Sequence, residues 1–209
     1  MATFNDHLNA LRRLIHDPND VLCPLTTKTA AVNDAVKERD QVTGGNRTLI
    51  EYTLTAGQGV YTFTEVGNTR ILDIVGIAVL WVGQRILMNQ VSYTDLAAYY
   101  RTWNTFRSTP IAFARYGAAS IRIGPLPAIA YATEWDVTQH TDELSGDTAD
   151  PLPYPYTEPV PYYAAHLCML NAQRYDEADE FLRMFTEKCN AVQGSRTGLL
   201  PTAYANPPR

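Results

Sequence analysis

The hydrophobic residues near the start of the chain recur every three or four positions, as they do along one face of a helix. They are Phe4, Leu8, Leu11 and Ile15. This spacing predicts a helix over residues 4–16, with Thr3 and Asp6 forming a capping box at its start. Pro18 ends that helix because proline cannot continue the hydrogen-bond ladder. A second apolar stripe predicts another helix over about 28–39.

From Thr48 the hydrophobic period changes to two, which is typical of β-strands. The runs at 48–55 and 60–63 predict a hairpin around Gly57-Gln58-Gly59. The run at 71–82 is apolar on both faces and predicts a central strand, which Gly83-Gln84 turns into the next one. A capped short helix follows, then a hairpin over 108–127 and a last strand over 128–135. Five or six strands of this length predict a small sandwich or barrel-like lobe.

The last third of the chain begins with a proline-rich segment, which predicts a stiff, extended linker. A helix follows from about Pro161 and is apolar nearly all round, which predicts burial on several sides. The next helix is expected over about 177–192, with Asp176 as its cap and Gly194 at its end. One apolar stripe runs along it: Ala178, Phe181, Leu182, Phe185, Cys189 and Val192.

These patterns predict an α+β fold. Helices from both ends of the chain form one bundle, and a small antiparallel β-sandwich or barrel-like lobe is inserted between them. The expected boundaries are 1–45 for the N-terminal helices, 46–140 for the β lobe, 141–160 for the linker, 161–194 for the C-terminal helix pair and 195–209 for an extended tail.

Composition and charge narrow the class of protein. The chain has 209 residues, of which 45% are hydrophobic and 19% charged, as in ordinary globular proteins. A net charge of -5 argues against tight nucleic-acid binding, which usually needs a basic excess. Cys23, Cys168 and Cys189 are expected to be buried thiols in a reducing compartment. Neither a signal peptide nor a membrane span is expected, so we predict a soluble, intracellular chain.

No strong enzymatic motif is present in the sequence. Gly44-Gly45 lacks the lysine of a phosphate-binding loop. His166 is expected to be a core histidine. The remaining candidates, for which solvated or ordinary surface positions are favoured, are His140 with Asp142, His7 with Asp6, and Asp136 with Glu134 beside Trp135. The sequence therefore predicts no enzyme, no cofactor and no bound metal.

Tyrosine is unusually frequent, with thirteen residues. Eight of them could form a stacking platform for carbohydrate or single strands: Tyr99, Tyr100, Tyr116, Tyr131, Tyr154, Tyr156, Tyr162 and Tyr163. Because few basic residues are interleaved, protein–protein contact is the favoured interpretation. The composition therefore favours a module of a larger assembly.

Four stretches have counterparts in one protein family. They are LRRLIHDPND at 11–20 with AAVNDAVKER at 30–39, TLTAGQGVYTF at 53–63, the STPIAFARYG and IRIGPLP strands within 108–127, and the helix pair at 160–192. In these stretches the chain resembles the head-to-tail adaptor (connector) proteins of tailed bacteriophages. The resemblance covers most of the chain, although each stretch is a loose match without a chemical signature.

The resemblance implies a structural protein of the virion neck that is assembled in the host cytoplasm. Such adaptors form a ring, here of twelve copies, that binds the portal, joins tail or nozzle proteins and continues the channel for packaged DNA. Within that ring we expect the C-terminal tail to dock on the portal or on a neighbouring copy through Leu199, Leu200, Pro201 and Tyr204. Alternatives are a tail terminator or tubular nozzle protein, a carbohydrate-active hydrolase of the virion, or a small β-sandwich binding module.

Overall fold

The computed structural model describes residues 1–99 and 102–197, in two compact units. One unit contains residues 1–46 together with the chain from 140 onwards, and the other contains residues 47–139. The described part holds five helices and mainly antiparallel sheets, which confirms the α+β class. No closed barrel forms among these residues, so the barrel-like alternative for the β lobe is wrong.

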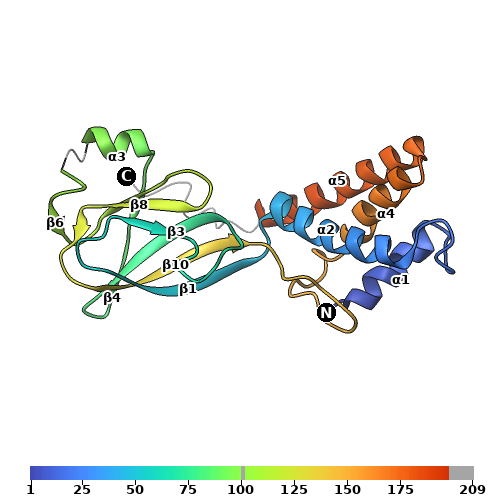
Figure 1. Cartoon of the computed structure of the whole chain (residues 1–209), viewed down its shortest axis with the longest axis horizontal. Helices are drawn as coiled ribbons and strands as arrows, with labels where there is room; N and C mark the ends of the chain where they lie inside the picture. Colours follow the sequence, from blue (N-terminus) through green and yellow to red (C-terminus); the bar gives the residue numbers. More distant parts are fainter. Residues whose placement is uncertain (100–101, 198–209) are drawn as a thin grey trace, which may run out of the picture. The chain divides into compact units, whose positions relative to one another are not determined.

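Four helices make up the first unit (Figure 1). They are α1 (Phe4–Leu14), α2 (Leu25–Thr43), α4 (Val160–Asn171) and α5 (Tyr175–Thr197). All four contribute to one hydrophobic core, and α4 packs against each of the other three. This central place explains why α4 is apolar on nearly every side, since a helix with several neighbours has no face left for water.

The ends of these helices follow local sequence signals with one exception. At the start of α1, Thr3 N–H donates to Asp6 Oδ2 at 2.8 Å and Asp6 N–H donates to Thr3 Oγ1 at 3.2 Å, which confirms the capping box. The exception is α5, which begins at Tyr175, so that Asp176 lies in its first turn instead of capping it. The helix also continues past Gly194 to Thr197, because one glycine costs a helix only about 1 kcal/mol.

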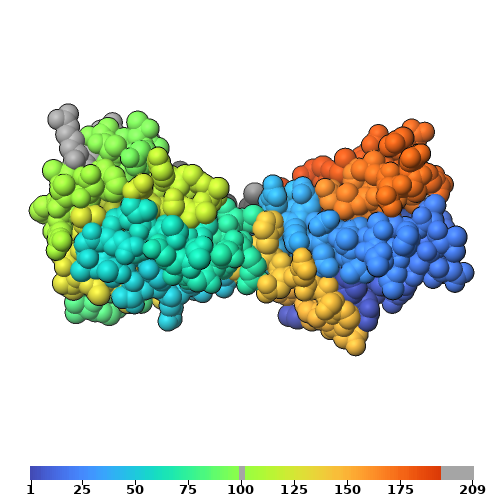
Figure 2. Space-filling model, viewed as in Figure 1, coloured from blue at the N-terminus to red at the C-terminus, as the bar shows by residue number. Residues whose placement is uncertain are grey.

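The proline-rich segment is packed on the helices, in contrast to the extended linker expected from its composition. Figure 2 shows this segment lying on the surface of the helical unit beside α2. Leu144 is buried in the helical core, and its backbone N–H and C=O groups both bond to the side chain of Asn33 on α2. Leu144 N–H donates to Asn33 Oδ1 at 2.8 Å, while Asn33 Nδ2 donates to Leu144 O at 3.2 Å. The segment therefore belongs to the helical unit.

The second unit is built on two four-stranded sheets and one two-stranded sheet. The first sheet has the order β1 (Arg47–Leu54), β10 (Tyr131–Gln139), β3 (Ile71–Trp81) and β4 (Gln84–Leu87). The second has the order β2 (Val60–Thr62), β8 (Ser120–Gly124), β7 (Ala112–Arg115) and β5 (Asn89–Gln90). A parallel pair, β6 (Arg107–Ser108) and β9 (Leu126–Pro127), and the short helix α3 (Tyr93–Tyr99) complete the unit.

Both four-stranded sheets contribute to a single core. Trp135 and Ile77 come from the first sheet, and Tyr61 and Phe113 from the second. The expected central strand at 71–82 is confirmed as β3, which lies between β10 and β4. The expected hairpin within 108–127 is also confirmed, as the antiparallel pair β7 and β8.

The hairpin expected from 48–55 and 60–63 is wrong, because its two strands lie in different sheets. β1 pairs with β10 through eight residue pairs, whereas β2 is three residues long and pairs with β8. The longer antiparallel ladder satisfies more backbone groups than the short local hairpin would. The turn between them is closed by Tyr61, whose hydroxyl donates to Gln58 O at 3.0 Å.

The turn that leads from β3 into β4 lies one residue earlier than expected. Because Trp81 pairs with Gln84, the two turn residues are Val82 and Gly83. Both have positive φ, 48° and 74°, as a type I′ hairpin turn requires. A β-branched residue is rare in this region of backbone space, so Val82 gave no sequence signal for such a turn.

The buried face of α5 provides a direct test of the helical core. Phe185 is 3% exposed, whereas Leu182, expected on the same stripe, is 36% exposed. We expect Phe185→Ala to lower the free energy of unfolding by about 3–5 kcal/mol, because it leaves a cavity. The matched variant Leu182→Ala should cost about 1 kcal/mol or less. Denaturant titrations would measure both, and equal effects would contradict this packing.

Candidate partner-binding surfaces

Most of the residues singled out as potential catalytic or metal-binding groups have structural partners, although the buried Nδ1 of His140 has no hydrogen-bond partner among the described residues. His166 is buried, as expected, with Nδ1 2.8 Å from Ala178 O. Glu134 pairs with Arg85 at 2.7 Å, and Asp136 pairs with Arg47. Across residues 1–99 and 102–197, no three His, Cys, Asp or Glu side chains lie close enough together to hold a metal ion.

His7 is buried, and the expectation of a solvated side chain is wrong. It is 2% exposed, and its Nε2 lies 3.1 Å from Asp150 Oδ2. The same carboxylate accepts from Arg39 Nη1 at 2.5 Å, and Arg39 Nη2 also donates to Asp40 Oδ1 at 2.9 Å. Asp40 in turn accepts from Thr141 N–H at 2.6 Å. These groups join α1, α2 and the segment after β10 within the core of the helical unit.

The Asp150 carboxylate is held in its charged form. Burial alone would raise the pKa of Asp150, but the hydrogen bond from His7 and the charge and hydrogen bond of Arg39 lower it by more. The net result is a pKa below the usual range for an aspartate. Because Asp150, Arg39 and Asp40 are all inaccessible to water, removing Asp150 would leave the Arg39 guanidinium buried with Asp40 as its remaining counter-charge.

A second charged cluster shapes the loop between α1 and α2. The Lys28 ammonium is fully buried and donates to Asp17 at 2.8 Å and to Asp20 at 2.7 Å. Arg12 also pairs with Asp20, at 2.6 Å. Burial opposes ionisation of Asp17, but hydrogen bonds from Lys28 and from the backbone N–H of Cys23 hold its pKa well below the usual range. The hydrogen bonds from Arg12 and Lys28 lower the pKa of Asp20 to about 2.

Lys28 and Arg39, the basic residues at the centre of the two clusters, lie on the buried face of α2. The sequence pattern predicted only the apolar positions of that face. The apolar stripe of α2 continues at helical spacing into charged residues, so that its buried positions are Lys28, Ala31, Val32, Ala35, Val36, Arg39, Asp40 and Thr43. Charged residues in register with an apolar stripe indicate buried ion pairs, because they would otherwise point into the core without a partner. This register in the sequence could have predicted the burial of Arg39 and Lys28.

The three cysteines are free and buried, as expected. Cys23 Sγ lies 3.2 Å from Cys168 Sγ, next to the Lys28 cluster. Burial raises the pKa of Cys189 to about 11, so this thiol stays protonated at neutral pH. These positions are typical of small hydrophobic core residues.

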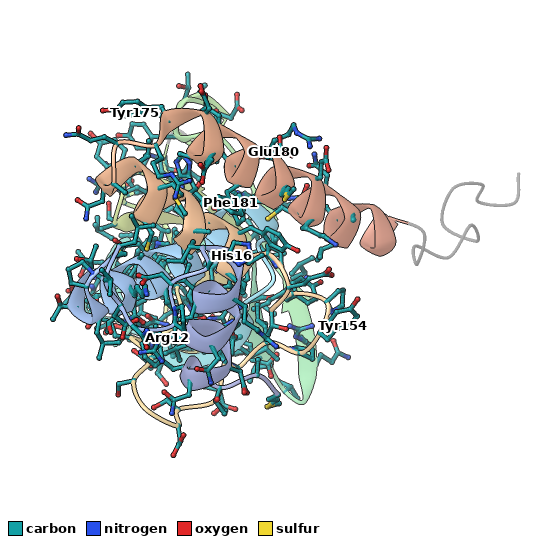
Figure 3. All side chains as sticks on the ribbon, turned by 90° about the vertical axis from the view of Figure 1, so that its right-hand side faces the viewer. Arg12, His16, Tyr154, Tyr175, Glu180 and Phe181 are labelled. Atoms are coloured by element: carbon teal, nitrogen blue, oxygen red, sulfur yellow. The ribbon has the colours of Figure 1, made fainter. Side chains whose placement is uncertain are left out.

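The helical unit has an open groove of about 490 Å³ along α1. Its walls are partly apolar, and the lining residues include Ala10, Leu14, Pro161 and Tyr162, together with the charged Arg13 and Glu158. Figure 3 shows Arg12 on α1, His16 just after that helix, and the outward-pointing Tyr154 and Tyr175, which are among the most exposed tyrosines. By contrast, Tyr131 is buried in the core of the β unit and Tyr163 packs partly buried against the helical core.

Exposed apolar residues of the β unit concentrate on the β3–β4 hairpin. Five of them lie at this hairpin, Leu80, Trp81, Val82, Ile86 and Leu87, whereas others, among them Leu49, Phe106, Ile111 and Ile129, lie elsewhere in the unit. Every residue of β4 is exposed, and Leu87 is 67% exposed. Large exposed apolar side chains gathered on one element are typical of a protein-binding surface.

The sequence was also compared with known proteins. A search of the curated proteins finds no significant match. The family model of the SU10 adaptor protein matches residues 2–205, which is nearly the whole chain. The chain belongs to the SU10 adaptor protein family. The expected relationship to phage head-to-tail adaptors is therefore confirmed.

Membership in the SU10 adaptor family makes this chain a structural adaptor of a bacteriophage particle, in a family that is not one of enzymes. In the part of the chain that the structure describes, no helix is both long and apolar enough to span a membrane. The expected docking residues Leu199, Leu200, Pro201 and Tyr204 lie outside the described residues. The surfaces described for this adaptor are thus the helical groove and the β3–β4 hairpin.

The buried carboxylate gives this adaptor a specific acid sensitivity. The folded-state pKa of Asp150 lies below the unfolded value of about 3.9. Its contribution is therefore complete above about pH 4 and is lost as the pH falls through the folded-state pKa. We expect Asp150→Asn to cost about 3–5 kcal/mol at pH 7, because the buried Arg39 then keeps only Asp40 as its counter-charge, and to flatten the loss of stability below pH 4.

The matched control is Glu143→Gln, in the same segment. Glu143 pairs with Lys37 at 3.3 Å, but both side chains are exposed, so this change should cost about 0.5 kcal/mol or less. Denaturant titrations at pH 3 to 7 measure both variants. If Asp150→Asn were no more destabilising than Glu143→Gln, the ion pair would not hold the unit together.

Proposed function

We propose that this chain is a head-to-tail adaptor, twelve copies of which form a ring beneath the portal in the virion neck. The ring joins the head to tail or nozzle proteins and continues the channel through which packaged DNA passes. The observation that carries the proposal is the family match over residues 2–205, which covers the helices, the β lobe and most of the tail. The concentration of exposed apolar residues on one hairpin supports a role in assembly.

The distribution of charge supports a channel that does not grip DNA. The stretches 1–46 and 140–209 hold ten basic and sixteen acidic residues, whereas residues 47–139 hold seven basic and six acidic ones. A ring of twelve chains, each of net charge -5, has a negative field that repels the phosphate backbone. DNA then passes without sequence-specific contacts.

The C-terminal tail is the proposed attachment to the portal. Its apolar residues Leu199, Leu200 and Tyr204 are the anchors, and Pro201 reduces the entropy lost on docking by stiffening the backbone. The alternative partner is a neighbouring adaptor copy. The expected tail began at residue 195, but α5 continues to Thr197, so we propose residues 198–209 as the docking segment.

Truncation after Thr197 tests this attachment. We expect the melting temperature to stay within about 2 °C of the full chain, since the core residues of all four helices are retained. Binding to DNA-filled heads should be lost, and co-sedimentation with purified heads measures it. Infectious particles completed by the truncated chain would refute tail docking.

A matched pair of tail variants separates anchoring from mere length. Leu199→Asp with Leu200→Asp should abolish binding to heads, because charged side chains cannot enter an apolar site. Pro207→Ala with Pro208→Ala keeps the length and the apolar anchors, so binding should be retained. Equal binding by both variants would show that Leu199 and Leu200 are not the anchors.

The charge argument predicts weak DNA binding. The isolated full-length protein should bind duplex DNA with a Kd weaker than about 1 μM even at low salt, because its net charge of -5 offers no cationic surface large enough to release counterions. Fluorescence anisotropy with a labelled duplex at 20 mM salt measures this. Submicromolar affinity would favour a DNA-gripping role.

A further inference from the structure

The first sheet of the β unit has two free edges. Its order is β1-β10-β3-β4, and among the described residues β1 pairs only with β10 and β4 only with β3. A free edge presents a row of unpaired backbone N–H and C=O groups that can accept another strand. Natural proteins often protect such edges with proline, lysine or a bulge, and neither β1 nor β4 contains proline or lysine. Both edges of this sheet are therefore open to pairing with a further strand.

The two edges run in opposite directions. All three pairings in this sheet are antiparallel, and the sheet has four strands. A second copy placed beside the first in the same orientation therefore brings its β1 antiparallel to β4. In a ring every copy points the same way, and this sheet can continue from copy to copy without reversing any of them.

The two edges of the sheet present exposed side chains on the same face. Cross-strand partners lie on one face of a sheet, and one such row contains Glu51, Glu134, Ala78 and Leu87. The next row on this face contains Thr53, Ala132, Leu80 and Arg85. This face is exposed at both edges, where Leu49 is 59% and Leu87 67% exposed.

The charges at the two edges are complementary. Glu51 on β1 forms no ion pair with any described residue, and Arg85 on β4, which pairs with Glu134 of its own chain at 2.7 Å, carries the opposite charge on the same face. In the antiparallel register that places Glu51 opposite Arg85, Leu49 lies opposite Leu87, and pairing would remove both leucines from water.

We propose that β4 of one copy pairs antiparallel with β1 of the next, so that the first sheets of neighbouring copies form a continuous sheet around the ring. The inference rests on the ring of the proposed function and adds the surfaces that join its copies. The contact is heterologous, since two different edges meet, and heterologous contacts close into rings. With four residues β4 spans only about 13 Å, so this junction sets register and needs additional contacts for affinity.

Thiol cross-linking in rings assembled on the purified portal tests the contact. Leu49→Cys and Leu87→Cys are made in separate full-length chains, one of which carries a longer affinity tag. The natural cysteines are buried, so a bismaleimide reacts with the introduced thiols. Mixed rings should give a cross-linked dimer containing one chain of each kind, and rings of either variant alone should give none.

The control pair is Leu87→Cys with Tyr116→Cys, because Tyr116 is exposed but follows β7 in the other sheet and should not cross-link. Rings that form without the mixed dimer would overturn the β4–β1 contact alone. Self-cross-linking of Leu87→Cys would also overturn it, by showing that two β4 edges meet. If the unmodified chain forms no ring on the portal, the proposed function fails and the contact fails with it.

A proline variant tests the backbone pairing itself. Met88 N–H donates to Ile77 O at 2.8 Å, so by alternation the N–H of Arg85 points to the free edge. Arg85→Pro removes that outward donor without breaking the ladder to β3. Arg85→Thr loses the same side chain and keeps the N–H. Light scattering of each variant mixed with purified portal measures ring assembly. Arg85→Pro should form no ring and Arg85→Thr should form one, and rings from both would refute strand pairing.

Discussion

The helical unit depends on the buried ion pair between Asp150 and Arg39. The carboxylate comes from the segment that returns from the β unit, and the guanidinium comes from the buried face of α2. With His7 of α1 on the same carboxylate oxygen, the cluster joins three parts of the chain that are far apart in sequence. Because charges in a core are tolerated only with their partners, this cluster specifies how the proline-rich segment lies on the helices.

The two units differ in their charge and in the apolar side chains that they expose. The helical unit has a continuous core, two buried charged clusters and an acidic composition. The β unit is nearly neutral in composition, with an open sheet whose edge strand and hairpin expose apolar side chains. The family match and the surface chemistry thus lead to the same proposed role in assembly.

Much of the fold could be predicted from local patterns. The helical stripes, the capping box at Thr3 and the buried strand β3 each follow from spacing alone, and each appears in the structure. Pairing between distant strands could not be predicted this way, because the residues that pair with β1 lie 77 to 91 positions later in the sequence and a glycine turn next to β1 imitates a hairpin. The burial of Asp150 was also hidden, since its partners Arg39 and His7 lie on other elements and prolines around it are typical of linkers.

The candidate surfaces were harder to predict than the fold. The apolar run that predicts β3 as a central strand also supplies Leu80 and Trp81, which are exposed near the hairpin turn, and nothing in the alternation marks where burial ends.

The most direct test of the account is the mass of the complex between purified portal and this full-length chain, measured by mass photometry. Twelve chains of 23.3 kDa each predict an added mass of about 280 kDa per portal ring. A portal ring that gains no mass at saturating concentrations of this chain would contradict the adaptor role.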